Sequence, residues 1–221
     1  DRHFDPENPR TRDRVEFQGL LGSMKIWALM FAFAGVFVLS SWMLNLLAFY
    51  LSFVVVGVII IYSYSKRFTS FSHLFLGFVL GTAPAGAWVA VRGELGWVPI
   101  HLFAAGMLWV AGFDVIYSCL DVDFDKSRGL YSFPRLLGVR GALVASAAAH
   151  AGTVLLLFLV GRGADLGTLY WLGLVTASTL LVWEHWVVRP DDLSRVDLSF
   201  FNINAWVSVA ISAGAIADVF L

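Results

Sequence analysis

Four aspartates lie close together in a chain that is otherwise mostly apolar. Two basic residues follow them, and the run contains Asp114, Asp121, Asp123, Asp125, Lys126 and Arg128. Carboxylates four positions apart, such as Asp121 and Asp125, lie on one face of a helix and repel each other. Mg²⁺ relieves such repulsion, because it prefers hard oxygen ligands and often combines one or two carboxylates with phosphate oxygens. The run therefore predicts a site for Mg²⁺ and a phosphorylated ligand.

A second aspartate pair opens the chain. Residues 1–5 read DRHFD and residues 121–125 read DVDFD, and basic residues and a proline follow both copies. One such pair in a charged loop is most often simply solvated, whereas two pairs in similar surroundings favour two similar half-sites. These could each hold Mg²⁺ and clamp a diphosphate between them, while basic side chains neutralise its oxygens. The candidate basic side chains are Arg14, Lys66, Arg67, Lys126 and Arg128.

Hydropathy indicates which elements must position these side chains. The chain has 221 residues, of which 59% are hydrophobic and 14% charged, whereas soluble domains carry about 25% charged residues. A helix needs about 20 apolar residues to cross a bilayer, and seven runs approach or exceed this length. They lie at 24–41, 43–64, 71–91, 97–118, 139–160, 168–188 and 199–220, with a tight turn expected around Ser40–Trp42. The predicted fold is an all-α, polytopic transmembrane helical bundle.

Lys and Arg residues predict the orientation of this bundle. Thirteen of the fifteen lie in the N-terminal segment, or in or beside the loops on the same side of the bundle as that segment. Only Arg92 and Arg162 lie toward the other side. Because cytoplasmic connections are enriched in Lys and Arg, the basic face is predicted to be cytoplasmic. Both aspartate pairs lie on this face, at the mouth of the bundle. A cation-coupled transporter is the alternative from another class, although transporter sites usually lie near the bilayer midplane.

Five motifs in order resemble those of the UbiA-type membrane prenyltransferases, in the 4-hydroxybenzoate polyprenyltransferase-like branch. The family's second aspartate motif is similar to the run Asp114, Tyr117, Asp121 and Asp125, followed by GLYSFP at 129–134. Its first motif, N-x-x-x-D-x-x-x-D, is similar to Asp1 and Asp5 with NPRTRDR at 8–14. The other similar runs are 62–69 (YSYSKRFT), 81–88 (GTAPAGAW), and Glu184–His185 with 190–196 (PDDLSRV). The resemblance covers essentially the whole chain.

The chain departs from the family pattern at its beginning. The Asn of the first motif would stand before Asp1 and is absent. Family members typically have nine spans, so the resemblance implies that the first span and most of the second are missing. We therefore expect residues 1–221 to form a single prenyltransferase domain that is truncated at its N-terminus.

The resemblance also implies a role for each site residue. The metal ligands would be Asp1 and Asp5 for one Mg²⁺ and Asp121 and Asp125 for the other. The diphosphate would be held by Arg14, Lys66, Lys126 and Arg128. The acceptor carboxylate would be bound by Arg67. The catalytic set would be Asp114, Tyr117, Asp121 and Asp125, in which the deeper Asp114 and Tyr117 orient a metal-bound water or the acceptor hydroxyl.

The implied reaction is an electrophilic substitution in quinone biosynthesis. A polyprenyl diphosphate would lose its diphosphate, and the allylic cation would be captured by the ring carbon ortho to the phenol of 4-hydroxybenzoate. Metals and basic residues would stabilise the departing diphosphate. A futalosine-pathway aromatic acid on the menaquinone route is the alternative acceptor. The expected partners are these substrates and the lipid bilayer, with no nucleic acid and no obligate protein, and the expected location is the bacterial inner (plasma) membrane.

The histidines fit less directly into this interpretation. Glu184 and His185 form a pair at the end of a predicted span, and no second His lies at ligand spacing. We therefore predict a structural role for the pair, capping the helix end and bonding the 190–195 loop. The remaining histidines with predicted structural or interfacial roles are His73, His101 and His150.

Overall fold

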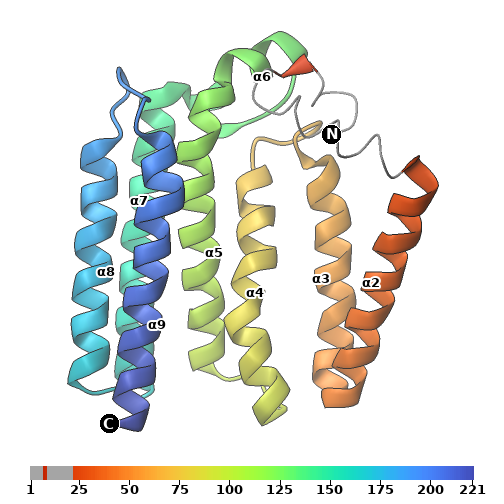
Figure 1. The fold of residues 1–221 in the computed structure, drawn as a ribbon, viewed down its shortest axis with the longest axis vertical. Coiled ribbons are helices and arrows are strands. Elements are labelled where there is room, and N and C mark those ends of the chain that lie inside the picture. The colour runs from red at the N-terminus through yellow and green to blue at the C-terminus, as the bar shows by residue number, and fades with distance from the viewer. Residues whose placement is uncertain (1–6, 9–21) are drawn as a thin grey trace.

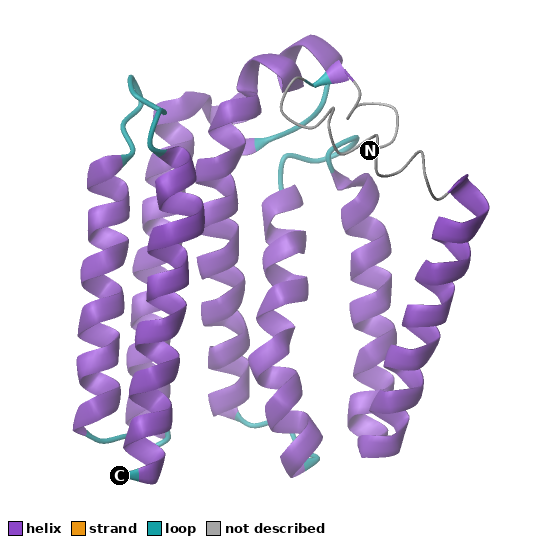
Figure 2. Ribbon diagram, in the orientation of Figure 1, coloured by secondary structure: helices purple, strands orange, loops and turns teal. Residues whose placement is uncertain are grey.

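The computed structural model describes residues 7–8 and 22–221, and this part of the chain is almost entirely helical (Figure 1, Figure 2). Its long helices are α2 (Gly22–Leu44), α3 (Leu46–Ser65), α4 (Ser72–Arg92), α5 (Trp97–Ser118), α7 (Phe133–Gly163), α8 (Thr168–Val187) and α9 (Asn204–Phe220). Its short helices are the 3₁₀-helix η2 (Cys119–Asp121), α6 (Val122–Arg128) and the π-helix η3 (Leu198–Ile203). The predicted all-α bundle is confirmed.

Each of the seven predicted spans corresponds to one long helix. In the described part, six helical segments are long and apolar enough to cross a membrane. Helix α8 has the required length of 20 residues, but it carries Glu184 and His185 near its end and is not among the six. The helices alternate in direction, so the α3–α4 loop, α6 and the 188–197 loop share one end of the bundle, at the top of Figure 1.

The predicted turn at Ser40–Trp42 is wrong, because the chain breaks at Asn45 instead. Helix α2 continues to Leu44, and Ser41 lies within it, where its hydroxyl donates to the Phe37 carbonyl oxygen at 2.8 Å, as hydroxyl side chains in helices often do. Asn45 has an extended backbone, with φ −168°, and its side chain accepts a hydrogen bond from the Ala48 amide at 2.8 Å. Asparagine is a favourable N-cap for this reason.

Helix α7 is kinked near its beginning. Gly138 has φ 71° and ψ 167°, which is a non-helical conformation that a residue with a side chain rarely adopts. Pro134 occupies the first turn, where its missing amide hydrogen costs no intrahelical hydrogen bond. The predicted span 139–160 therefore begins directly after the kink.

Glycine allows α4 and α5 to approach closely. A Cβ atom at Gly77 would collide with the Met107 carbonyl, and one at Gly81 would lie 2.7 Å from the Met107 amide nitrogen. Small residues at such positions let helix backbones pack in a membrane, where the hydrophobic effect does not drive helices together. Helices α5 and α7, and α8 and α9, also pack together, whereas α2 and α3 lie beside α4 at one edge (Figure 1).

This close approach predicts a position-specific effect on stability. Gly77→Val is expected to destabilise the protein by about 2–3 kcal/mol, because the added carbons overlap backbone atoms that cannot move independently. Gly86→Val on the same helix is the matched control, because nothing lies within 4 Å of a Cβ at Gly86. Thermal unfolding in detergent measures both changes, and equal losses would contradict the packing explanation.

A buried apolar cluster supports the end of the bundle that carries the charged residues. It joins the end of α5 and η2 to α7 and to the loop after α8. Its members are Val115, Ile116, Cys119, Ala142, Leu143, Val188 and Val196. The helix end that carries Asp114 is therefore fixed from several sides.

Candidate active site

Residues from four elements meet around Asp125. Asp125 lies in α6 and is only 1% exposed, although it is a carboxylate. Lys66, the C-cap of α3, and His73, in the first turn of α4, both exert an electrostatic effect on it. Asp121, at the end of η2, also acts on Asp125, with the opposite sign. The structure thus brings together the predicted pair Asp121 and Asp125 and the predicted cation Lys66.

Local backbone geometry holds Asp125 in place. Helix α6 ends at Gly129, whose φ of 70° is left-handed and needs glycine. The amides of Gly129 and Leu130 then both donate to the Asp125 carbonyl oxygen, the second at 2.9 Å. The next amide, of Tyr131, donates to the Lys66 carbonyl oxygen at 2.8 Å and so ties this turn to the end of α3. The GLYSFP run therefore serves to fix the position of the aspartate relative to the lysine.

A buried histidine was missed by the sequence interpretation of the site. His73 is 1% exposed, and its Nδ1 lies 2.6 Å from Asp114 Oδ2. The ring stands edge-on to Phe133, with centroids 5.9 Å apart. His73 also lies near enough to Asp125 to favour the charged form of that carboxylate. The available signal was its place shortly after the 62–69 run, which carries Lys66 and Arg67.

The described N-terminal residues lie against the second aspartate motif. Asn8 is 7% exposed and donates its Nδ2 to Asp121 Oδ1 at 3.1 Å. Glu7 Oε2 lies 2.9 Å from Arg128 Nη2. These contacts place Glu7 and Asn8, which follow the first aspartate motif in the sequence, beside the second motif. Asp1, Asp5 and Arg14 lie outside the described residues, so the roles expected for them stay predictions.

The other predicted cations lie on the surface around this group. Lys126 and Arg128 are exposed on α6, as is Asp123. Arg67 is exposed after α3, and its guanidinium lies 5.2 Å from the centre of the Tyr64 ring. The structure therefore separates a buried part of the predicted site, around Asp125, from an exposed basic rim.

An apolar cavity of about 490 Å³ lies between α4, α5, α7, α8 and α9. Phe113, which lines it, directly precedes Asp114 in α5. Tyr117 stacks on Phe200 of η3 with ring centroids 4.2 Å apart, and Phe113 meets the same ring edge-on at 5.3 Å. Helix α5 therefore carries both residues that line the cavity and, at its end, Asp114 and Tyr117. Phe200 was not identified from the sequence, because a π-helical turn has no clear sequence signal.

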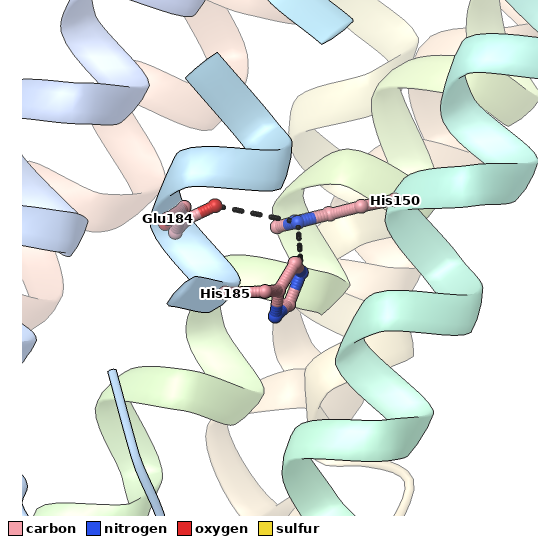
Figure 3. A group of neighbouring side chains, drawn as sticks. All are labelled: His150, Glu184 and His185. Carbon is pink, nitrogen blue, oxygen red and sulfur yellow. Dashed lines mark hydrogen bonds and ion pairs between the residues drawn. The ribbon is translucent and has the colours of Figure 1, made fainter. Parts of the chain in front are cut away.

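The expectation for Glu184 and His185 needs correction. His150 of α7, 35 residues away, brings the second imidazole to the pair, and His150 Nδ1 lies 3.0 Å from His185 Nε2 (Figure 3). The Glu184 side chain bonds Ser199 and Asn204, which lie beyond the predicted 190–195 partner loop. Sequence spacing could not reveal a pair that only the packing of two helices creates.

The sequence profile of the UbiA prenyltransferase family matches residues 1–206. This chain belongs to the UbiA family. Among its relatives, a 4-hydroxybenzoate octaprenyltransferase of Marinobacter nauticus is 32% identical over 99% of this chain and 74% of that protein. A protein of the same name from Xanthomonas oryzae pv. oryzae is 35% identical over 97% of this chain and 71% of that protein.

Solved structures agree with this assignment of the UbiA family fold. A UbiA homologue from Aeropyrum pernix K1 has a TM-score of 0.86 and 38% identity, covering 98% of this chain and 80% of that one. A digeranylgeranylglyceryl phosphate synthase has a TM-score of 0.75 and 18% identity, covering 98% of this chain and 78% of that one, and shows the fold alone. The predicted family and enzyme class, a membrane prenyltransferase, are confirmed, and the transporter alternative loses its support.

Proposed function

We propose that this UbiA-family enzyme transfers a polyprenyl group from an allylic diphosphate to an aromatic acid, with 4-hydroxybenzoate as the acceptor. The proposal rests on one observation: the buried carboxylate of Asp125, near Lys66, lies at one end of the bundle, and an apolar cavity lined in part by Trp109 and Phe113 lies among the helices of the same bundle. An amphiphilic substrate with a diphosphate head and a hydrocarbon tail matches both parts. The names of the Marinobacter and Xanthomonas relatives support 4-hydroxybenzoate as the acceptor, and we place the reaction in quinone biosynthesis.

The residues present fit Mg²⁺, which we propose as the cofactor. Asp125 is buried, and its Oδ2 has no hydrogen-bond partner in the described part of the chain. Asp121 lies near enough to repel it. Two hard carboxylates with an unsatisfied oxygen are suited to a cation that also binds phosphate oxygens. When bound, Mg²⁺ would neutralise charge that develops on the diphosphate.

The protein's own residues account for the rest of the mechanism. The allylic C–O bond breaks, and its electron pair leaves with the diphosphate. Lys66, with Lys126 and Arg128 on the rim, binds the departing anion. The aromatic faces of Phe113, Tyr117 and Phe200 stabilise the allylic cation and exclude water. The ring carbon ortho to the phenol then forms the new C–C bond and passes its proton to the released diphosphate, while Asp114 orients the phenol hydroxyl.

Arg67 is proposed to bind the acceptor carboxylate. Its guanidinium is exposed beside Tyr64, directly after the lysine that contacts the diphosphate. We expect Arg67→Ala to raise the KM for 4-hydroxybenzoate about 10-fold or more, because a charge-assisted hydrogen bond is lost, and to change the KM for the polyprenyl diphosphate far less. Initial rates with each substrate varied in turn measure this. Equal increases in both values would contradict the assignment.

The proposed acceptor can be tested directly. The complete protein in membranes is supplied with a polyprenyl diphosphate and labelled 4-hydroxybenzoate, and then with other aromatic acids. Lipid-extractable label from 4-hydroxybenzoate supports the proposal. Product only with a futalosine-pathway acid would keep the mechanism and change the acceptor. We also propose that residues 1–221 form one domain whose active site faces the cytoplasm of a bacterial inner membrane.

A further inference from the structure

Three side chains that are separated in the sequence from the carboxylate site meet inside the bundle (Figure 3). His150 comes from α7, and Glu184 and His185 come from the last turn of α8. Their ligand atoms all lie within 4.8 Å of one another. His150 Nδ1 is 3.0 Å from His185 Nε2 and 3.3 Å from Glu184 Oε2. His150 and Glu184 are buried, and His185 is partly exposed.

The hydrogen bond made by Nε2 of His150 determines whether Nδ1 carries a hydrogen or a lone pair. His150 Nε2 lies 3.2 Å from the Trp109 carbonyl oxygen, which can only accept a hydrogen bond. The Nε2 atom therefore carries the hydrogen, and a neutral ring has its lone pair on Nδ1. That lone pair faces the Glu184 carboxylate and the second imidazole.

The carboxylate of Glu184 is held in one orientation. Its Oε1 accepts hydrogen bonds from Ser199 Oγ at 2.6 Å and from Asn204 Nδ2 at 2.7 Å. Its Oε2 is buried and has no hydrogen-bond partner among the described residues. A buried oxygen without a partner is unfavourable. Oε2 is turned toward Nδ1 of His150, so a positive charge between them would satisfy both atoms.

A metal ion satisfies this group better than a proton does. A hydrogen on His150 Nδ1 points at either His185 or Glu184, so one of the two acceptors stays unsatisfied. A metal ion contacts all three ligand atoms at once. Tetrahedral Zn²⁺ bonds of about 2.0–2.1 Å place neighbouring ligand atoms about 3.3 Å apart. The observed separations of 3.0 and 3.3 Å are close to this value.

We propose that His150, Glu184 and His185 bind one divalent transition-metal ion, with Zn²⁺ as the best match. Two imidazoles and one carboxylate form a known zinc ligand set that leaves a position for water. The imidazole ligands favour Zn²⁺ over Mg²⁺, so this site differs in chemistry from the Asp121–Asp125 pair. The Trp109 carbonyl, Ser199 and Asn204 are the outer partners that orient metal ligands in such sites.

The test measures metal binding by the full-length protein without a polyhistidine tag. The protein is stripped with a chelator in detergent, and Zn²⁺ is added in a titration followed by metal analysis and thermal unfolding. We expect about one high-affinity Zn²⁺ per chain and a higher Tm. Glu184→Gln keeps the side-chain volume and the Ser199 contact, and it is expected to weaken Zn²⁺ binding at least about 10-fold. Asn204→Ala is expected to weaken binding about 10-fold or more through the outer partners.

Two matched controls separate this site from other metal ligands. His101→Ala removes a histidine near the opposite end of the bundle, where its ring contacts Trp97. Asp125→Asn removes a proposed Mg²⁺ ligand. Both variants are expected to bind Zn²⁺ as the unaltered protein does. Absence of Zn²⁺ binding and of a Tm shift in the unaltered protein would overturn the proposal, as would unchanged binding by Glu184→Gln when that variant folds normally.

Discussion

Asp125→Asn is expected to lower turnover about 1000-fold, which is the scale of losing one group that stabilises developing charge in an active site. Asn keeps the shape of the side chain but removes its negative charge. In the folded protein, Asp125 is buried beside Lys66, and one of its oxygens has no hydrogen-bond partner among the described residues. The loss should therefore appear in catalysis and in dependence on Mg²⁺, and not in folding.

Asp123→Asn is the matched control for this effect. Asp123 lies two residues earlier in the same short helix but is exposed. The same chemical change there is expected to alter turnover less than about 2-fold, as surface substitutions usually do little. Rates at saturating substrates and the concentration of Mg²⁺ for half-maximal activity are measured for both. Similar losses in the two variants would show that total charge on α6, and not the buried carboxylate, controls the reaction.

His73 and Asp114 are expected to act as one unit. Asp114→Asn and His73→Phe should each lower kcat about 100-fold, because small displacements of a positioned group have effects of this size. The expected cause is loss of the 2.6 Å contact between His73 Nδ1 and Asp114 Oδ2. The double variant should be little worse than either single one, since both remove the same interaction.

A conservative variant distinguishes positioning by His73 from simple packing. His73→Asn offers a hydrogen-bond donor near the position of Nδ1 and is expected to recover part of the kcat lost in His73→Phe. Thermal unfolding serves as the control for folding. Additive losses in the double variant, or His73→Asn no more active than His73→Phe, would contradict the assignment of His73 as a positioning residue for Asp114.

The helices could be predicted because each span is a long apolar run. The predicted span 97–118 agrees with α5, and the predicted start at 139 follows the Gly138 kink. The turn between the first two helices was misplaced, because Ser40–Trp42 lies within α2. The actual break depends on the Asn45 amide, which caps α3 and also donates to the Val89 carbonyl oxygen of α4 at 2.8 Å. That second contact is tertiary and leaves no local pattern.

The candidate site was predictable where its chemistry is local in sequence. Asp121, Asp125 and Lys66 were identified from aspartate spacing and from the basic run, and the structure brings them together. His73 was not placed there, because its partner Asp114 is 41 residues away and a single histidine in an apolar helix has many structural explanations. The His150–His185 contact was missed for the same reason.

Diphosphate release and lipid product, followed together while Mg²⁺ is varied, show whether prenyl transfer depends on Mg²⁺ held by Asp125. The complete protein in membranes is supplied with a polyprenyl diphosphate and labelled 4-hydroxybenzoate, and Mg²⁺ is titrated after chelation. We predict that both signals rise together with Mg²⁺ in a one-to-one ratio and that both are lost in Asp125→Asn. Lipid-extractable label that forms equally well without Mg²⁺, or in Asp125→Asn at the unaltered rate, would contradict this prediction.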